Sequence, residues 1–61
     1  MTAKELERLL LREGWRKTDQ KGSHAHYIHP VNPVKLTVPQ HSGKDLKPGT
    51  LARILKDADL D

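Results

Sequence analysis

The sequence predicts a small α+β domain in which two amphipathic helices enclose three short strands. Apolar residues recur at helical spacing near both ends of the 61-residue chain, and the middle alternates apolar and polar residues between turn signals. The sequence holds no cysteine, which excludes disulfides and thiolate metal sites as sources of stability. We therefore expect residues 1–61 to form one domain with a thin core.

The first helix is expected over about residues 3–13. The segment Thr2–Glu5 has the form of a capping box, in which the threonine hydroxyl accepts a backbone N–H and the glutamate reaches back to the cap. Gly14 suits the left-handed residue that ends a helix. One apolar face is supplied by Leu6, Leu9 and Leu10.

Three strands are expected to follow as an antiparallel meander. The first covers Trp15–Gln20 and the second His24–His29, with a turn at Lys21–Ser23 between them. Another turn at Pro30–Pro33 precedes the third strand, which Pro39 ends because proline has no N–H for the ladder. The core face of this third strand would carry Val34, Leu36 and Val38.

Alternation along the second strand decides which side chains meet the core. We expect Ala25 and Tyr27 to face the helices. This choice places His24 and His26 on the open face of the sheet, near Lys35 if the third strand pairs alongside. A slip of one residue in the pairing would reverse the assignment.

The second helix follows a polar loop over residues 40–47. Pro48 fits the first turn of this helix, and Thr50 is interpreted as an alternative cap. Its apolar face is made by Leu51, Ile54, Leu55 and Ala58. The resulting α-β-β-β-α order, with both helices on one face of the sheet, matches the double-stranded-RNA-binding fold.

Charge is distributed unevenly along the chain. The formal net charge is +3, and residues 16–47 alone hold six basic against two acidic side chains. Such a field attracts polyanions, so nucleic acid is the first candidate partner, although an ordinary soluble surface can carry a similar charge. The longest apolar run is three leucines, far below the roughly 20 residues of a membrane span, so we expect a cytoplasmic protein without membrane contact.

One histidine follows a turn that suits a phosphate group. His24 comes after Lys21, Gly22 and Ser23, which offer charge, close backbone approach and a hydroxyl donor. Histidine suits proton transfer because its ordinary pKa of about 6.5 leaves both forms available near neutrality. The segment is interpreted as a phosphate seat beside a proton carrier, and a simple hairpin turn before a solvent-facing histidine is the alternative.

Other basic residues extend the candidate RNA-binding surface. Lys35 and Lys44 would stabilise charge on a phosphorane, while Lys44 and Lys47 precede the second helix, whose positive end favours an anion. His41 in the same loop is either a phosphate contact or a loop anchor.

A metal site is a competing interpretation of the histidines. His24 and His26, with His29 or His41, would gather two or three imidazoles, but no cysteine or well-spaced carboxylate completes the ligand set. We therefore expect no metal and no other cofactor, and interpret His29 as a residue at the surface end of a strand.

The motifs occur in an order that resembles the HicA toxins of HicA/HicB toxin–antitoxin systems. The resemblance covers nearly all 61 residues. It rests on Gly14-Trp15, Lys21-Gly22-Ser23-His24, Tyr27, His29-Pro30, Val38-Pro39, His41, Asp45-Leu46-Lys47-Pro48-Gly49-Thr50-Leu51 and Ile54-Leu55. The second helix departs from the family pattern, because it ends Ala58-Asp59-Leu60 where the family has Ala-Gly-Leu.

The resemblance implies an endoribonuclease that cleaves mRNA, halts translation and is neutralised by a HicB antitoxin bound over the active site. The family's catalytic histidine carries onto His24, where we expect general acid–base catalysis. The second proton step is left to water, a lysine, His26 or His41. Two alternatives remain open, namely a non-catalytic RNA-binding module and a small protein whose basic face meets only an acidic partner.

Overall fold

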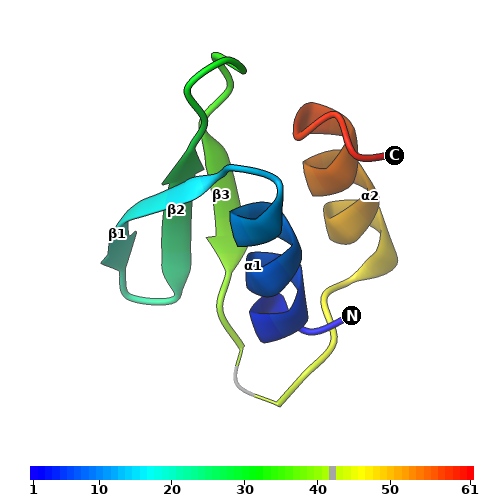
Figure 1. Cartoon of the computed structure of the whole chain (residues 1–61). Coiled ribbons are helices and arrows are strands. Elements are labelled where there is room, and N and C mark those ends of the chain that lie inside the picture. The colour runs from blue at the N-terminus through cyan, green and yellow to red at the C-terminus, as the bar shows by residue number, and fades with distance from the viewer. Residues whose placement is uncertain (42) are drawn as a thin grey trace.

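The computed structural model describes residues 1–41 and 43–61. Its elements are, in chain order, α1 (Ala3–Arg12), β1 (Arg16–Lys21), β2 (His24–Ile28), β3 (Leu36–Pro39) and α2 (Pro48–Asp57). The strands form one antiparallel sheet in the order β1-β2-β3, and both helices lie on the same side of it (Figure 1). The expected fold class and element order are confirmed.

The expected capping box is present at the start of α1. The Thr2 hydroxyl accepts the backbone N–H of Glu5 at 3.2 Å, and the Glu5 carboxylate accepts the N–H of Thr2 at 2.9 Å. These bonds lower the pKa of Glu5 because they favour its charged form. The stabilisation from this carboxylate is therefore present above its ordinary pKa and is lost as the pH falls through the lowered value.

The sheet register sets which side chains enter the core. Ala25 and Tyr27 of β2 lie opposite Val38 and Leu36 of β3, and all four are buried. Ile28, on the other face of β2, is 45% exposed. The predicted register is therefore confirmed.

The core joins the sheet to both helices. Most of each helix surface remains exposed, because the core takes only one side of each helix. Its buried residues are Ala3, Leu6, Leu10, Trp15, Ala25, Tyr27, Leu36, Val38, Leu46, Ile54 and Ala58. Burial of this core stabilises the chain because each leucine, isoleucine or valine side chain fully removed from water contributes about 1.5–3 kcal/mol.

The third strand is shorter than expected. It begins at Leu36, and Val34 is 40% exposed before it, so the placement of Val34 on the core face is wrong. The cause is the preceding turn, in which the Asn32 side chain accepts the N–H of Val34 at 2.9 Å and also donates to the carbonyl of Asp57 at 3.0 Å. Those bonds fix Val34 in the turn instead of the ladder.

The first strand contributes no buried side chain. Its register shifts between Lys17 and Asp19, so Thr18 forms a bulge and its hydroxyl donates to the carbonyl of His26 at 3.3 Å. A bulge inserts one extra residue and changes which side chains share a face. As a result, Lys17 and Gln20 lie opposite Tyr27 and Ala25, on the helix side of the sheet.

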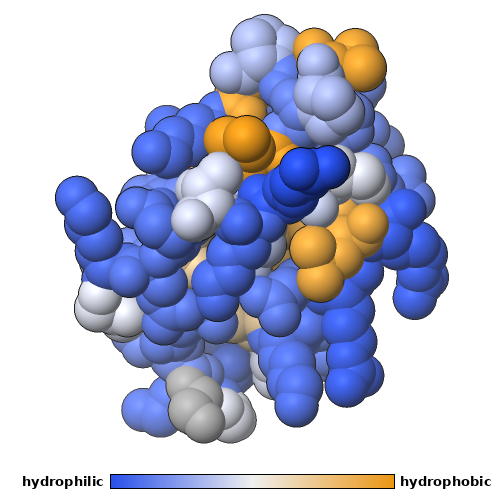
Figure 2. Space-filling view, turned by 60° about the vertical axis from the view of Figure 1, so that its left-hand side comes forward, coloured by the Kyte–Doolittle hydropathy of each residue, from blue (hydrophilic) through white to orange (hydrophobic). Residues whose placement is uncertain are grey.

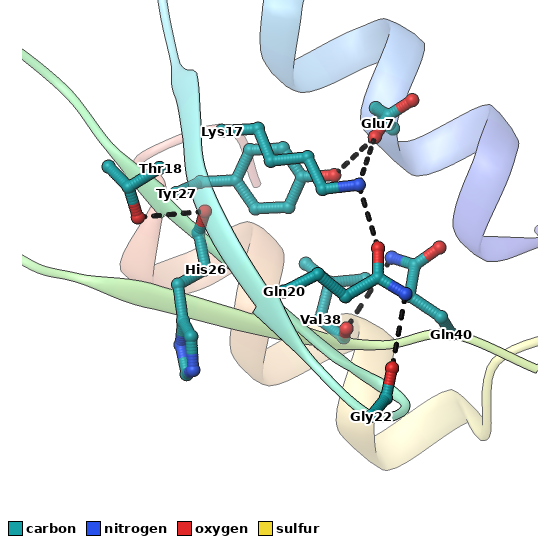
Figure 3. Close-up of polar contacts among 9 residues, drawn as sticks. All are labelled: Glu7, Lys17, Thr18, Gln20, Gly22, His26, Tyr27, Val38 and Gln40. Carbon is teal, nitrogen blue, oxygen red and sulfur yellow. Dashed lines mark hydrogen bonds and ion pairs between the residues drawn. The ribbon is translucent and has the colours of Figure 1, made fainter.

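A chain of polar contacts crosses this side of β1 (Figure 3). The Tyr27 hydroxyl donates to the Glu7 carboxylate at 2.6 Å, and Lys17 lies 3.8 Å from the same carboxylate. Lys17 also donates to Gln20 at 2.8 Å, and Gln20 donates to the carbonyl of Gly22 at 3.1 Å. Burial and the bond to Glu7 raise the pKa of Tyr27, which keeps its hydroxyl a donor. The contacts therefore connect α1 with the turn that precedes His24.

The face of the molecule drawn in Figure 2 is mainly hydrophilic. Figure 2 shows isolated hydrophobic areas, one of them at the top of the view, where Figure 1 places the connection between β2 and β3. Val31 in that connection is 84% exposed. Within the residues described, neither helix is long and apolar enough to cross a membrane.

His29 follows the last residue of β2, at the opposite end of this strand from His24. It holds neighbouring segments together through hydrogen bonds, whereas we expected only a surface residue. Its Nδ1 accepts the N–H groups of Val31 at 3.0 Å and Asn32 at 3.2 Å. Nδ1 must therefore be unprotonated, and Nε2 donates to the carbonyl of Glu13 at 3.1 Å. The ring also lies 5.0 Å from that of the buried Trp15.

This packing makes Gly14 a sensitive position. Its φ is +94°, and a Cβ added there would meet Nε2 of His29 at 3.0 Å. We expect Gly14→Ala to lower the free energy of unfolding by about 2 kcal/mol, because the methyl group adds a clash to an unfavourable backbone conformation. Thermal unfolding followed by circular dichroism measures the loss.

Gly22→Ala is the matched control for this prediction. Gly22 also has a positive φ, +57°, but an added Cβ meets nothing within 4 Å. Its substitution carries the backbone cost alone, so Gly14→Ala is expected to be the more destabilised variant. Equal losses in the two variants would show that the His29 contact is unimportant.

Candidate functional site

A cleft opens where the sheet meets the loop before α2. It encloses about 430 Å³. It is lined by His24, Pro39, His41, Lys44, Asp45, Leu46, Lys47 and Thr50. Four residues that the sequence marked for function, two histidines and two lysines, thus face one space although they are up to 23 positions apart in the chain.

His24 enters the cleft from the first position of β2. Its partners across the sheet are Lys21 on β1 and Pro39 on β3. The side chain is exposed, as the predicted register requires. The imidazole of His24 is therefore accessible to a bound molecule and to solvent.

His41 reaches the same cleft because its loop is tied to the turn beside His24. The N–H of Gln40, the residue that follows β3, donates to the carbonyl of Ser23. The N–H of Lys44 donates to the carbonyl of His41 at 3.1 Å, and the N–H of Leu46 donates to that of Met1 at 2.8 Å. The buried Leu46 side chain fixes the second half of the loop. Backbone bonds therefore bring the two histidines to one cleft.

The first turn of α2 supplies a positive end to the cleft. Lys47 is the N-cap, no side chain caps the helix, and Pro48 occupies its first turn. The leading N–H groups of a helix have no partner within it, and together with the helix dipole they favour an anion. The interpretation of Thr50 as an alternative cap is wrong, because Thr50 lies inside the first turn and lines the cleft.

The predicted phosphate seat at Lys21–Ser23 adjoins His24 but does not line the cleft. Lys21 lies across from His24, and Gly22 sits in an open turn, but none of these three side chains lines the cleft. Lys35 also lies outside the lining of the cleft. It precedes β3, where Thr37 and Pro39 occupy the positions opposite His26 and His24, and it lines a neighbouring hollow with Arg53. Lys35 therefore does not share the cleft with His24 and His41.

His26 is occupied by a contact within the sheet. Its Nδ1 lies 3.0 Å from the Thr37 hydroxyl, and the side chain points away from the helices (Figure 3). It does not line the cleft of His24. In the part of the chain that the structure describes, no three histidine or carboxylate side chains are placed to hold a metal ion.

Sequence reasoning did not mark Thr50 or Pro39 as part of the site. Thr50 looked like a helix cap, and Pro39 looked only like a strand stop. The Leu46-Lys47-Pro48 order before the helix was the available signal, because a proline in the first turn places residues 47 and 50 at the exposed helix end.

Comparison with known proteins identifies the family of the chain. One family model matches, described as the HicA toxin of bacterial toxin–antitoxin systems, and the match runs over residues 3–60. A search of curated proteins found no match. Because the family match includes all five elements and every residue that lines the cleft, the chain belongs to the HicA toxin family.

Proposed function

We propose that this toxin is an endoribonuclease that cleaves mRNA, with His24 acting in general acid–base catalysis. The observation that carries the proposal is the cleft that combines His24 and His41 with Lys44, Lys47 and the uncapped end of α2. Proton carriers beside fixed positive charge are what cleavage of an RNA phosphodiester requires.

In the proposed reaction the RNA supplies its own nucleophile. A base removes the 2′-OH proton, the 2′ oxygen bonds to phosphorus, and the bond from phosphorus to the 5′ oxygen breaks as an acid protonates that oxygen. The products are a 2′,3′-cyclic phosphate and a 5′-OH. Lys44, Lys47 and the N–H groups of α2 would stabilise the negative charge that develops on the phosphorane.

We assign the second proton step to His41. His26 is bonded to Thr37 and lies outside the cleft, whereas His41 shares the cleft with His24. Two imidazoles on either side of a phosphate can act as base and acid in one turnover, since histidine exists in both forms near neutrality.

The proposed partners follow from the same surface. A cognate HicB-type antitoxin would neutralise the toxin by covering the cleft, which lies open between β3 and α2. Lys21, Gly22 and Ser23 border His24 and would contact RNA phosphates outside the cleft. The substrate, mRNA, places the proposed action in the cytoplasm.

The test is cleavage of a defined RNA by the purified chain. We expect products with cyclic phosphate ends from RNA, and no products from an otherwise identical strand with 2′-deoxyribose, because the nucleophile is then missing. Binding of the RNA without cleavage would instead support the alternative function, a non-catalytic RNA-binding module.

Expression in cells provides a second readout of the same proposal. Growth should stop as mRNA shortens, and co-expression of the cognate antitoxin should restore both. Growth arrest with intact mRNA would contradict the proposal.

A further inference from the structure

A second hollow continues from the cleft along the outer side of β3. It encloses about 350 Å³ and is bounded by β3 and α2. It is lined by Lys35, Leu36, Thr37, Pro39, Thr50, Arg53, Ile54 and Asp57. Pro39 and Thr50 line both spaces, so the hollow adjoins the cleft, and the two together are called the groove below.

The groove follows one face of α2. Thr50, Arg53, Ile54 and Asp57 recur at helical spacing, and β3 forms the opposite wall as the edge strand of the described sheet. Leu36 and Ile54 are buried at its floor, whereas Lys35 and Arg53 are exposed at its rim. The surface that a ligand would meet is therefore mainly polar with two cations at its rim, which suits a phosphate.

Charge favours an anionic chain in the joined groove. Four cationic side chains and two carboxylates line it. Among the described residues, neither Lys35 nor Arg53 forms an ion pair, although Asp57 lines the same hollow. Their charge is therefore available to a ligand.

The groove is long enough to contact more than one phosphate of a bound nucleic acid. Arg53 lies six positions after Lys47, the N-cap of α2, which corresponds to about 9 Å along the helix axis. One strand of a stacked nucleic acid places a phosphate about every 3.4 Å along its axis, so the groove spans at least two phosphate positions.

We infer that the groove between β3 and α2 is a substrate subsite for single-stranded RNA, in which Arg53 and Lys35 bind a phosphate next to the one cleaved at His24. This inference rests on the proposed function. It adds that the RNA is single-stranded and that the RNA leaves the cleft along β3 and α2. Single strands are the expected ligand because a cationic groove that follows the backbone of one strand is typical of proteins that bind single-stranded nucleic acid.

The test measures binding separately from cleavage. A fluorescent RNA oligonucleotide with 2′-deoxyribose at the cleavage position binds without being cut, and its affinity is measured over a range of salt concentrations. Arg53→Gln should weaken binding by about threefold to tenfold and reduce the slope of log K against log salt by about 0.7, the value for one phosphate contact on a single strand. Arg53→Lys should restore most of the slope.

Lys56→Gln is the matched control. Lys56 is an exposed cation on the same helix, but it lines neither the cleft nor the hollow. Its substitution should leave affinity and slope unchanged. With cleavable RNA, Arg53→Gln should raise KM by a similar factor and change kcat much less, because the contact is distant from the reacting atoms.

Shortening the RNA locates the contact. The loss caused by Arg53→Gln should disappear when the oligonucleotide is cut back to the two nucleotides that flank the cleaved bond. An equal affinity and slope for Arg53→Gln and the wild type, or an equal loss on long and short RNA, would overturn the inference. Because these measurements use uncleaved RNA, they decide the subsite even if wild-type cleavage, and with it the proposed function, fails.

Discussion

Replacing His24 by alanine is expected to lower RNA cleavage by a factor of about 10² to 10⁴, which is the usual contribution of a positioned acid or base. The side chain is exposed, and within the described residues it makes no hydrogen bond, so its loss should leave the fold intact. Growth and mRNA integrity, followed together during expression, should both recover in this variant.

His26→Ala is the control for this prediction. His26 lies two positions away on the same strand face but outside the cleft, so cleavage should remain close to wild type. Matching melting curves for the two variants would exclude unfolding as the cause. Toxicity that survives His24→Ala would refute the proposed mechanism.

Replacing His41 by glutamine should lower kcat by about 10² and remove one limb of the pH–rate profile, because a two-histidine mechanism requires one neutral and one charged ring. The amide preserves hydrogen bonding but cannot transfer a proton. The His41 side chain is exposed, so the expected loss lies in the reaction and not in folding.

The pH profile separates this role from simple phosphate binding. A His41→Gln variant with raised KM, normal kcat and an unchanged bell-shaped profile would make His41 a binding residue. His24 would then be the sole essential imidazole, with water or a lysine in the second role. Lys44→Gln provides a comparison, because loss of a phosphate contact in the same cleft should act mainly on KM.

The register of the sheet was predictable because the alternation of apolar and polar residues along β2 determines it. Ala25 and Tyr27 alternate with histidines, so only one register buries the apolar pair, and the structure has that register. The capping box at Thr2 was predictable for a similar reason, because both of its hydrogen bonds are local. Such features depend on residues three or fewer positions apart.

Features that depend on distant partners were not predictable. The bulge at Thr18 follows from pairing with β2, and the start of β3 depends on how Asn32 bonds to the end of α2. The cleft depends on the bond from Gln40 to Ser23, which no local pattern encodes. For this reason the sequence marked His24 and His41 separately, whereas the structure brings them to one cleft.

The bulged strand β1 also bears on how folded molecules of this protein meet one another. It is an edge strand of the described sheet, and all six of its side chains are exposed and polar. Unprotected edges recruit strands from other molecules, whereas charged, irregular edges resist this addition. The charged, bulged edge of β1 is therefore expected to disfavour strand addition between folded molecules.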